Sequence, residues 1–271
     1  MNELQIKNFE KDLLSSLIKL KLNKNKNVYI TSNLTKISRF RFSKEKKLNL
    51  FYECIKKSIG KNYSIFVPSA TLNLCNTSIP FDLKHTPSDK MGPFAEYVRL
   101  KKSIRSLHPF WSISGLGKNA KILKKVSKHA YGYGSPWSKM LELDFLQLNI
   151  GMHPSKAVTL VHHVETLMGV PYRYNKTFKH KIKIKNKIYE DNFFQSVFFK
   201  EANSKKKIKL NEHFFNELKK RKKLNYTKHS SGLEMWSFKM RDFFNVATEF
   251  FVKDIYTYLE FEPDLKNISE Y

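Results

Sequence analysis

The chain has 271 residues, of which 41% are hydrophobic and 14% aromatic, a composition typical of a globular protein and not of a disordered one. It contains no apolar run long enough to span a bilayer, and its charged, amphipathic N-terminus does not follow the order of a secretory signal, so we expect a cytoplasmic protein. The formal charge of +26 favours anionic partners, and the two cysteines, Cys54 and Cys75, are too few for a disulfide framework or a cysteine-based metal site.

The positive charge has two interpretations. The lysines occur throughout the chain, in KLKLNKNKN, KHKIKIKNK, SKKKIK and KKRKK, as they would on solvated faces and loops. They also suit the attraction of nucleic acid, an anionic membrane surface or a phosphate-rich small molecule. Because no RNA-binding aromatic signature or zinc-finger spacing occurs, we expect no specific nucleic-acid partner, while peripheral membrane contact stays open.

The N-terminal half alternates predicted helices and short apolar strands. Apolar spacing predicts a helix over residues 4–22, a strand at 28–31, a helix over 46–59 and a strand at 64–71. Strand, helix and strand joined by tight turns is the α/β pattern. Residues 72–94 form an irregular stretch, and a loop of that length inside a compact domain is usually functional or locally disordered.

The middle of the chain continues this pattern. FAEYVRLKK is predicted as a helix, a turn at His108-Pro109 precedes a strand, and KNAKILKKVSKH is predicted as a basic helix. The stretch YGYGSPW is a glycine-rich turn, FLQLNI is a strand, and TLVHHVETLM is a helix that ends at Gly169.

The sequence changes character from about residue 176. KHKIKIKNKIYEDNFF alternates lysine with isoleucine, which predicts an edge strand or hairpin protected by charge, and two amphipathic helices follow in NEHFFNELKKRKK and MRDFFNVATEFFVKDIYTYL. No repeat or linker is visible. We therefore expect one α/β domain over 1–271 with a divergent, basic C-terminal subregion.

His162 and Glu165 are the first candidates for chemistry. They lie i,i+3 on the helix that Thr159 begins, on the side away from its apolar face. Histidine suits general-base chemistry at neutral pH, and a nearby carboxylate would hold its tautomer. The alternative is a surface helix whose His and Glu face water. A metal site would need a third ligand, which the sequence does not nominate.

Other segments carry weaker signals. Arg105 suits a phosphate, and His108 before a proline is expected at a turn, although a purely structural turn is the alternative. SGLGKNAK lacks the spacing of a phosphate-binding loop, and the dinucleotide-binding and serine-hydrolase glycine motifs are missing as well. Cys75 has no local base that would make it a nucleophile.

Several of these segments, in their order, resemble the aminoglycoside 3-N-acetyltransferase family. They are VYITSNLTKIS, IFVPSAT, PFD, MGPFAEYVR, RSLHPFWSISGLG, YGYGSPWSKMLELD, LQLNIG and TLVHHVETLMGVPYR, the last matching the family's T-x-x-H-x-x-E segment followed by Pro-Tyr-Arg. The similarity covers roughly residues 25–175 and extends more weakly to about 260. Single pieces are unspecific, but their order and spacing are not.

The resemblance implies a three-layer α/β/α fold with a central mixed sheet and acetyl transfer from acetyl-CoA to an amine, with no metal. By position, His162 is implied as the general base, Glu165 as its orienting carboxylate and Thr159 as a group that polarises the thioester carbonyl. The turns implied to hold the pantetheine and pyrophosphate arms of acetyl-CoA contain Ser32, Asn33, Leu34, Ser69, Arg105, Ser106, His108 and Ser112.

The sequence also departs from the family. Three extra residues lie between Gly151 and Thr159, which leaves the role of His153 open, and His163 has no fixed counterpart. Aminoglycosides are polycations that a strongly basic protein would repel unless its acceptor pocket were locally acidic. We therefore expect a glycan branch rather than a resistance enzyme, with an amino sugar or a nucleotide- or lipid-linked sugar as acceptor. The rival hypotheses are a non-catalytic binder of nucleic acid or anionic glycan, and a transferase of formyl or another acyl group.

Overall fold

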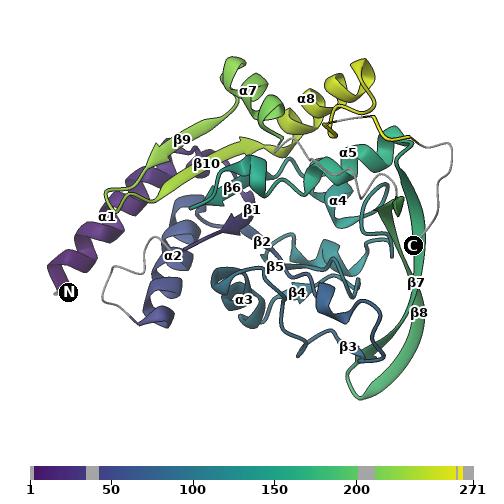
Figure 1. Cartoon of the computed structure of the whole chain (residues 1–271). Helices are drawn as coiled ribbons and strands as arrows, with labels where there is room; N and C mark the ends of the chain where they lie inside the picture. The colour runs from purple at the N-terminus through teal and green to yellow at the C-terminus, as the bar shows by residue number, and fades with distance from the viewer. Residues whose placement is uncertain (1–2, 35–42, 201–210, 261, 265–271) are drawn as a thin grey trace.

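The computed structural model describes residues 3–34, 43–200, 211–260 and 262–264. Its centre is a seven-stranded sheet with strand order β4-β5-β2-β1-β6-β10-β9 (Figure 1). The central strand β1 (Asn27–Ser32) pairs in parallel with β2 (Ser64–Pro68) on one side and with β6 (Leu146–Ile150) on the other. The carboxyl ends of these three strands therefore meet at one edge of the sheet, where α/β proteins place their ligands.

The outer strands of this sheet run antiparallel to their inner neighbours, which makes the sheet mixed. On one side β5 pairs with β2 and β4 with β5; on the other side β10 pairs with β6 and β9 with β10. Their bounds are β4 Ile104–Arg105, β5 Ile113–Gly117, β9 Asn225–Lys228 and β10 Glu234–Lys239. The predicted strands at 28–31, 64–71 and 145–150 are confirmed, whereas β9 and β10 were not predicted.

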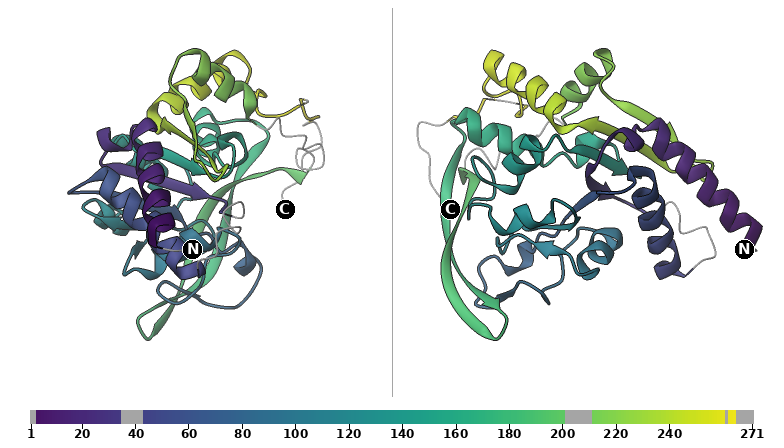
Figure 2. Two further views of the ribbon diagram at one scale, coloured as in Figure 1. Left: turned by 90° about the vertical axis from the view of Figure 1, so that its left-hand side faces the viewer. Right: turned by 180° about the vertical axis from the view of Figure 1, so that it is seen from behind.

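Helices cover both faces of the sheet, because successive side chains of a strand point to opposite faces. Val28 and Ile30 join a core with α1, α2 and α3, while Tyr29 joins a second core with α4, α5, α7 and α8 (Figures 1 and 2). The bounds are α1 Glu3–Lys19, α2 Lys44–Ile59, α3 Pro93–Leu100, α4 Pro136–Glu142, α5 Leu160–Met168, α7 Glu212–Lys220 and α8 Met240–Lys253. The predicted three-layer α/β/α fold is confirmed.

A smaller sheet lies at the opposite side of the molecule from α1 (Figures 1 and 2). It consists of β3 (Phe81–Asp82) and a long hairpin of β7 (Arg173–Ile184) and β8 (Lys187–Phe198), which is the hairpin predicted from the lysine–isoleucine alternation. Exposed lysines alternate with buried His180 and Ile182 along β7, as the sequence pattern indicates. Because β7 begins directly after α5, the hairpin fixes the chain that leaves the predicted His–Glu helix.

Three short segments differ from the prediction or add to it. The predicted helix over KNAKILKKVSKH is wrong: the chain forms only the short 3-10 helix η4 (Ala120–Lys124) and then continues as bends and turns. The stretch 72–94 contains β3 and a second 3-10 turn, η3 (Leu72–Leu74). Two more such turns are η1 (Leu22–Lys24) and η5 (Pro154–Lys156). In the part of the chain that the structure describes, no helix is both long and apolar enough to cross a membrane.

Candidate active site

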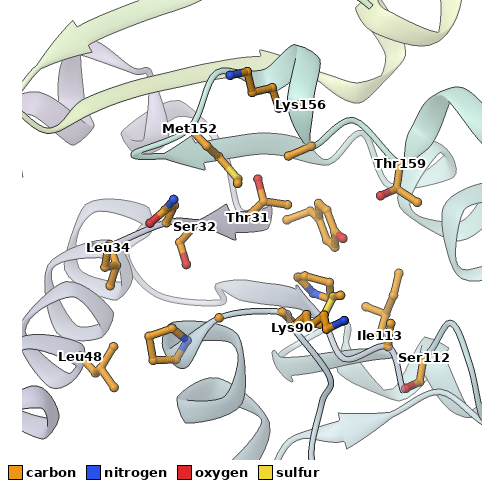
Figure 3. Close-up of a pocket in the computed structure, with 18 of the residues that line it drawn as sticks. Thr31, Ser32, Leu34, Leu48, Lys90, Ser112, Ile113, Met152, Lys156 and Thr159 are labelled. Atoms are coloured by element: carbon orange, nitrogen blue, oxygen red, sulfur yellow. The ribbon is translucent and has the colours of Figure 1, made fainter. Parts of the chain in front are cut away.

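A cavity of about 890 Å³ opens at the carboxyl ends of β1, β2 and β6 (Figure 3). Its wall combines the turn after β1, the start of α2, the loop before α3 and the segment between β6 and α5. In the view of Figure 3, Thr31 lies between Met152 and Lys156 on one side and Lys90 and Ile113 on the other. This is the edge at which the three parallel strands end.

The charge on the cavity wall has one sign. Its lining residues include four lysines, Lys44, Lys47, Lys90 and Lys156, and no aspartate or glutamate among the described residues. The remainder is a mixture of hydroxyl, amide, aliphatic and aromatic side chains, including Trp111 and Trp137. A cavity with cationic and apolar walls suits an elongated ligand that carries negative charge on one part and an uncharged chain on another.

The turn after β1 is held in place by close backbone contacts. The Asn33 N–H donates to the Ile150 carbonyl at 2.7 Å, so this turn continues the pairing of β1 with β6. Gly151 has φ +75°, and a Cβ added there would lie 1.9 Å from the Asn33 carbonyl oxygen. Only glycine fits this approach, which brings Ser32, Asn33 and Leu34 to the cavity wall.

His162 and Glu165 form a direct contact on α5. His162 Nδ1 lies 2.6 Å from Glu165 Oε2, and the His162 side chain is 23% exposed while Glu165 is completely buried. Arg173 Nη2 lies 3.1 Å from the same Nδ1 and 3.0 Å from Glu165 Oε2. The shorter contact, to the carboxylate, is satisfied when Nδ1 carries the proton and Arg173 donates to Oε2, and proton exchange with a substrate would then use Nε2. The alternative of a surface pair facing water is therefore wrong for Glu165.

Tyr172 and Arg173, which follow α5, complete the network around the carboxylate. Arg173 Nη2 lies 3.0 Å from Glu165 Oε2, and the Tyr172 hydroxyl donates to Oε1 at 2.9 Å. The Arg173 guanidinium also packs 3.7 Å from the centre of the Phe198 ring, and its Nη1 donates to the Ser196 carbonyl. The β7–β8 hairpin thus supplies the cation that compensates the buried carboxylate.

The electrostatics keep Glu165 ionised. Burial alone would raise the pKa of Glu165, but the Arg173 guanidinium and His162 outweigh it and hold the pKa below its ordinary value. Burial, together with the same carboxylate, raises the pKa of Tyr172, so this hydroxyl stays a neutral donor. A buried anion with a neutral donor and a fixed cation is the arrangement that orients a histidine acting as a base.

Thr159 connects this network to the cavity. It lines the cavity and lies three residues before His162, so the two residues share one face of the helix start. Thr159 occupies the predicted N-cap position, but its backbone is helical and its side chain makes no cap hydrogen bond. The rings of Tyr131 and Tyr258 pack edge-on against His162 with centroids 5.6 and 5.7 Å away. The cavity wall therefore includes a residue one helical turn before the candidate base.

The remaining predicted site residues fall into two groups. Ser32, Asn33, Leu34 and Ser112 line the cavity, as Thr159 does. Four others are absent from its wall and are buried behind it: Ser69, Arg105, Ser106 and His108. Ligand contact by this second group stays a prediction, and the structure gives each of them partners in the protein.

Arg105 and His108 hold the loop that carries Ser112 and Trp111. The Arg105 Nε donates to the Ser112 hydroxyl at 2.8 Å, and its two other nitrogens donate to the carbonyls of Thr86 and Ser69. Burial and the neighbouring Arg99 lower the pKa of Arg105 to about 9. His108 is 3% exposed, and its Nδ1 accepts from the Trp111 N–H at 3.1 Å. Burial lowers its pKa to about 4, so the ring is a neutral acceptor near pH 7.

The two histidines whose roles the sequence left open are also placed. His163 is buried beside Phe244, and its Nδ1 accepts from the Gly132 N–H at 3.0 Å, while burial lowers its pKa to about 4. His153 precedes η5 and accepts the Ser155 N–H. Neither belongs to the network around Glu165, so the extra residues before Thr159 form a separate turn.

The sequence analysis did not name Tyr172 and Arg173 as site residues, although both lie in the segment TLVHHVETLMGVPYR. The available signal was an arginine immediately after a helix that carries a glutamate, but spacing alone does not show that the chain turns back onto that glutamate. A second signal was missed in the strand LQLNI, where Gln147 and Asn149 are polar and completely buried. Buried polar side chains in a strand need partners, which points to a specific arrangement around them.

Comparisons with known proteins show the family and the fold. Residues 47–252 match the family profile described as aminoglycoside 3-N-acetyltransferase. Among solved structures, aminoglycoside acetyltransferase AAC(3)-Xa has a TM-score of 0.75 and 14% identity over 92% of this chain and 98% of its own. AAC-IIIb, in a binary complex with CoASH, has a TM-score of 0.75 and 16% identity over 90% of this chain and 96% of its own. The YokD protein from Bacillus subtilis has a TM-score of 0.70 and 18% identity over 90% of this chain and 99% of its own. A sequence comparison with curated proteins finds no match.

Proposed function

Since the chain belongs to the aminoglycoside 3-N-acetyltransferase family, whose model matches residues 47–252, we propose that it transfers the acetyl group of acetyl-CoA directly to an amine. The amine belongs to an amino sugar or to a sugar-nucleotide or glycan precursor. The observation that carries this proposal is the buried Glu165 network, with Arg173, Tyr172 and His162 around the carboxylate, in which His162 lies one helical turn from the cavity-lining Thr159.

The cavity suits acetyl-CoA on two grounds. Its lysines match the phosphates of the nucleotide, and its apolar and hydroxyl-bearing wall, which includes Thr159, matches the uncharged arm that carries the acetyl group. An acetyl group at Thr159 would lie beside the helix start that also carries His162. The acceptor then approaches His162 from the side that is exposed to solvent, where 23% of its side chain is accessible.

The chemistry follows from these positions. His162 takes a proton from the acceptor nitrogen as that nitrogen attacks the acetyl carbonyl, and the Glu165 carboxylate stabilises the imidazolium that forms. The hydroxyl of Thr159 donates to the carbonyl oxygen as negative charge develops on it. The carbon–sulfur bond then breaks, and the thiolate leaves and takes up a proton to give CoA. Each proton and electron pair is accounted for without a metal.

The acceptor class rests on charge. The acceptor reaches His162 through the field of a chain of formal charge +26, to which the neighbouring acetyl-CoA cavity contributes four lysines and, among its described residues, no carboxylate. This field favours an acceptor with negative charge over a polycation. An amino sugar linked to a nucleotide or to a lipid pyrophosphate has both the amine and the negative charge. We place the reaction in the cytoplasm, where acetyl-CoA and such precursors are both available.

The test is a titration with acetyl-CoA followed by an assay of thiol release with a panel of amines. We expect one acetyl-CoA site, and acetyl transfer that prefers a nucleotide-linked amino sugar over an aminoglycoside. His162→Ala should lower kcat at least roughly 100-fold and leave acetyl-CoA affinity nearly unchanged. His85→Ala, at an exposed histidine outside the site, is the matched control. Full activity of His162→Ala would refute the base, and preference for the aminoglycoside would refute the acceptor class.

A further inference from the structure

A row of buried polar side chains lies behind the cavity, in the middle of the main sheet. Gln147 and Asn149 are both completely buried on β6, and Asn149 stands directly opposite Thr31 in the register of β6 with β1. Thr31 is 8% exposed, and it lines the cavity near the centre of the view in Figure 3. Polar groups in the centre of a sheet are costly unless they are paired, so each of these side chains needs a hydrogen-bond partner.

The backbone fixes the orientation of Gln147. Its Nε2 lies 3.2 Å from the carbonyl oxygen of Ala157, a group that can only accept. The side-chain nitrogen of Gln147 must therefore be the atom at that position, because the opposite orientation would place two oxygens against each other. The same nitrogen lies 3.3 Å from Asn149 Oδ1 and donates to it.

This orientation sets the direction of the next bond as well. With Oδ1 of Asn149 turned toward Gln147, its Nδ2 faces Thr31 and lies 2.7 Å from Thr31 Oγ1. An amide nitrogen only donates, so the Thr31 oxygen accepts and its own proton must point elsewhere. Within the described ranges the Thr31 hydroxyl donates no hydrogen bond to the protein, and the side chain borders the cavity.

We propose that Thr31 is a ligand-binding residue whose hydroxyl donates to a carbonyl oxygen in the pantetheine arm of acetyl-CoA. Gln147 and Asn149 are then positioning residues that act through Thr31, since they force its proton into the cavity. The proposal rests on the proposed function, because it assumes that acetyl-CoA occupies this cavity.

The arm is the part of the molecule that fits this donor. In Figure 3, Leu48 of α2, the helix whose first turn carries Lys44 and Lys47, lies at one side of the cavity, Thr159 at the other and Thr31 between them. With the phosphates at those lysines and the thioester at Thr159, Thr31 faces the stretch between the two. The neutral acceptors in that stretch are the two amide carbonyls of pantetheine. A neutral hydroxyl held as a donor matches such a carbonyl and discriminates against a ligand group that can only donate.

The test is calorimetric titration of the whole protein with CoA. Thr31→Val should weaken CoA binding roughly 2- to 12-fold, the range for one neutral hydrogen bond, and Thr31→Ser should restore it. Thr227→Val is the matched control, because Thr227 is a β-strand threonine with 7% exposure that lies outside the cavity. The double variant Thr31→Val/Asn149→Leu lacks both partners of the hydrogen bond between these two side chains. It should bind CoA as weakly as the single variant Thr31→Val.

The positioning role is tested by reversing the direction of the bond. Asn149→Asp offers Thr31 only an acceptor, so the hydroxyl should turn away from the cavity and weaken CoA binding as much as Thr31→Val does. Asn149→Leu leaves the hydroxyl able to donate to the ligand, and its affinity should stay within about twofold of wild type. Equal weakening by the two Asn149 variants would show a merely structural role and overturn the positioning role.

A second ligand tests which half of CoA the Thr31 hydroxyl contacts. Binding of 3′-phospho-ADP, which lacks the arm, should be the same for wild type and Thr31→Val. A weaker affinity of the variant for this nucleotide would place the donor on a phosphate and overturn the proposal. A wild-type protein that binds no CoA would overturn both this proposal and the proposed function, whereas equal affinities of wild type and Thr31→Val for CoA would overturn the donor alone.

Discussion

Replacement of Glu165 by glutamine probes the buried network while keeping the size of the side chain. The carboxylate is completely buried and accepts from His162, Arg173 and Tyr172. In Glu165→Gln the remaining oxygen can still accept from His162 if the new amide nitrogen faces Tyr172, whose hydroxyl can also accept. The hydrogen-bond geometry is then retained and the negative charge is lost, so the variant isolates the electrostatic contribution of the carboxylate to turnover and to stability.

The magnitude of the effect follows from the contacts that lose their charge. A hydrogen bond to a charged group contributes roughly 1.5–3 kcal/mol, so the imidazolium that forms at His162 should lose about this much stabilisation. At about 1.4 kcal/mol for each factor of ten, kcat should fall roughly 10- to 150-fold. The Arg173 guanidinium, whose side chain is 6% exposed, is left without its counter-charge, and unfolding should become easier by roughly 3 kcal/mol.

The loss of stability should depend on pH with a defined sign. The pKa of Glu165 lies below its ordinary value of 4.5, so the carboxylate contributes stability that is present above pH 4.5 and is lost as the pH falls further. Glutamine cannot contribute this stability at any pH. The difference in unfolding free energy between wild type and Glu165→Gln should therefore be constant near pH 7 and should narrow below pH 4.5.

The assay combines thiol-release kinetics with urea unfolding at several pH values. Glu142→Gln is the matched control, because Glu142 is an exposed helix residue that pairs with Lys139. We expect the control to behave as wild type in both measurements, since exposed ion pairs contribute little. A Glu165→Gln enzyme with wild-type kcat would refute the orienting role, and a stability difference that does not narrow in acid would refute the depressed pKa.

Three further predictions concern stability and ligand binding. Burial lowers the pKa of His163 to about 4, so the free energy of unfolding should fall as the pH drops from about 6.5 toward 4. In urea unfolding, His163→Gln should make this fall with pH shallower. An unchanged pH dependence in the variant would contradict the neutral, buried ring. Gly151→Ala should lower the free energy of unfolding by at least ~2 kcal/mol, because its Cβ would meet the Asn33 carbonyl oxygen, whereas Gly232→Ala, also at positive φ but with open space around it, should cost less. Acetyl-CoA affinity should weaken as salt is raised, and a salt-independent affinity would contradict the role of the cavity lysines.

The fold followed from the sequence where one pattern dominated. Thr159, Gly169 and the apolar face between them predicted α5, and the lysine–isoleucine alternation predicted the β7–β8 hairpin. The predicted basic helix over KNAKILKKVSKH failed because Lys121, Lys124, Lys125 and Lys128 recur three and four residues apart, where like charges destabilise a helix. The strands β9 and β10 are short and partly polar, so they lacked a clear period.

The candidate site was predicted only in part, because spacing along one helix does not show what packs against it. The i,i+3 spacing brought His162 and Glu165 together, but the burial of Glu165 depends on Tyr172 and Arg173, which turn back from the start of β7. For Arg105, the sequence indicated a chemical role but not the partners that the side chain has in the structure. Its chemistry suits a phosphate, yet its guanidinium donates to the Ser112 hydroxyl and to the carbonyls of Thr86 and Ser69.

The charge of the cavity bears on which amine this family member acetylates. A polycationic acceptor must be drawn to carboxylates near the reacting nitrogen, and the described wall of the neighbouring cavity adds lysines to the field around that site instead. Glu165 does not supply that attraction, since it is completely buried and compensated by Arg173. The same lysines that suit the phosphates of acetyl-CoA would suit a second phosphate group on the acceptor. We therefore expect that positive charge around the site, and not a change of fold, would direct this chain from an antibiotic to a phosphate-linked amino sugar.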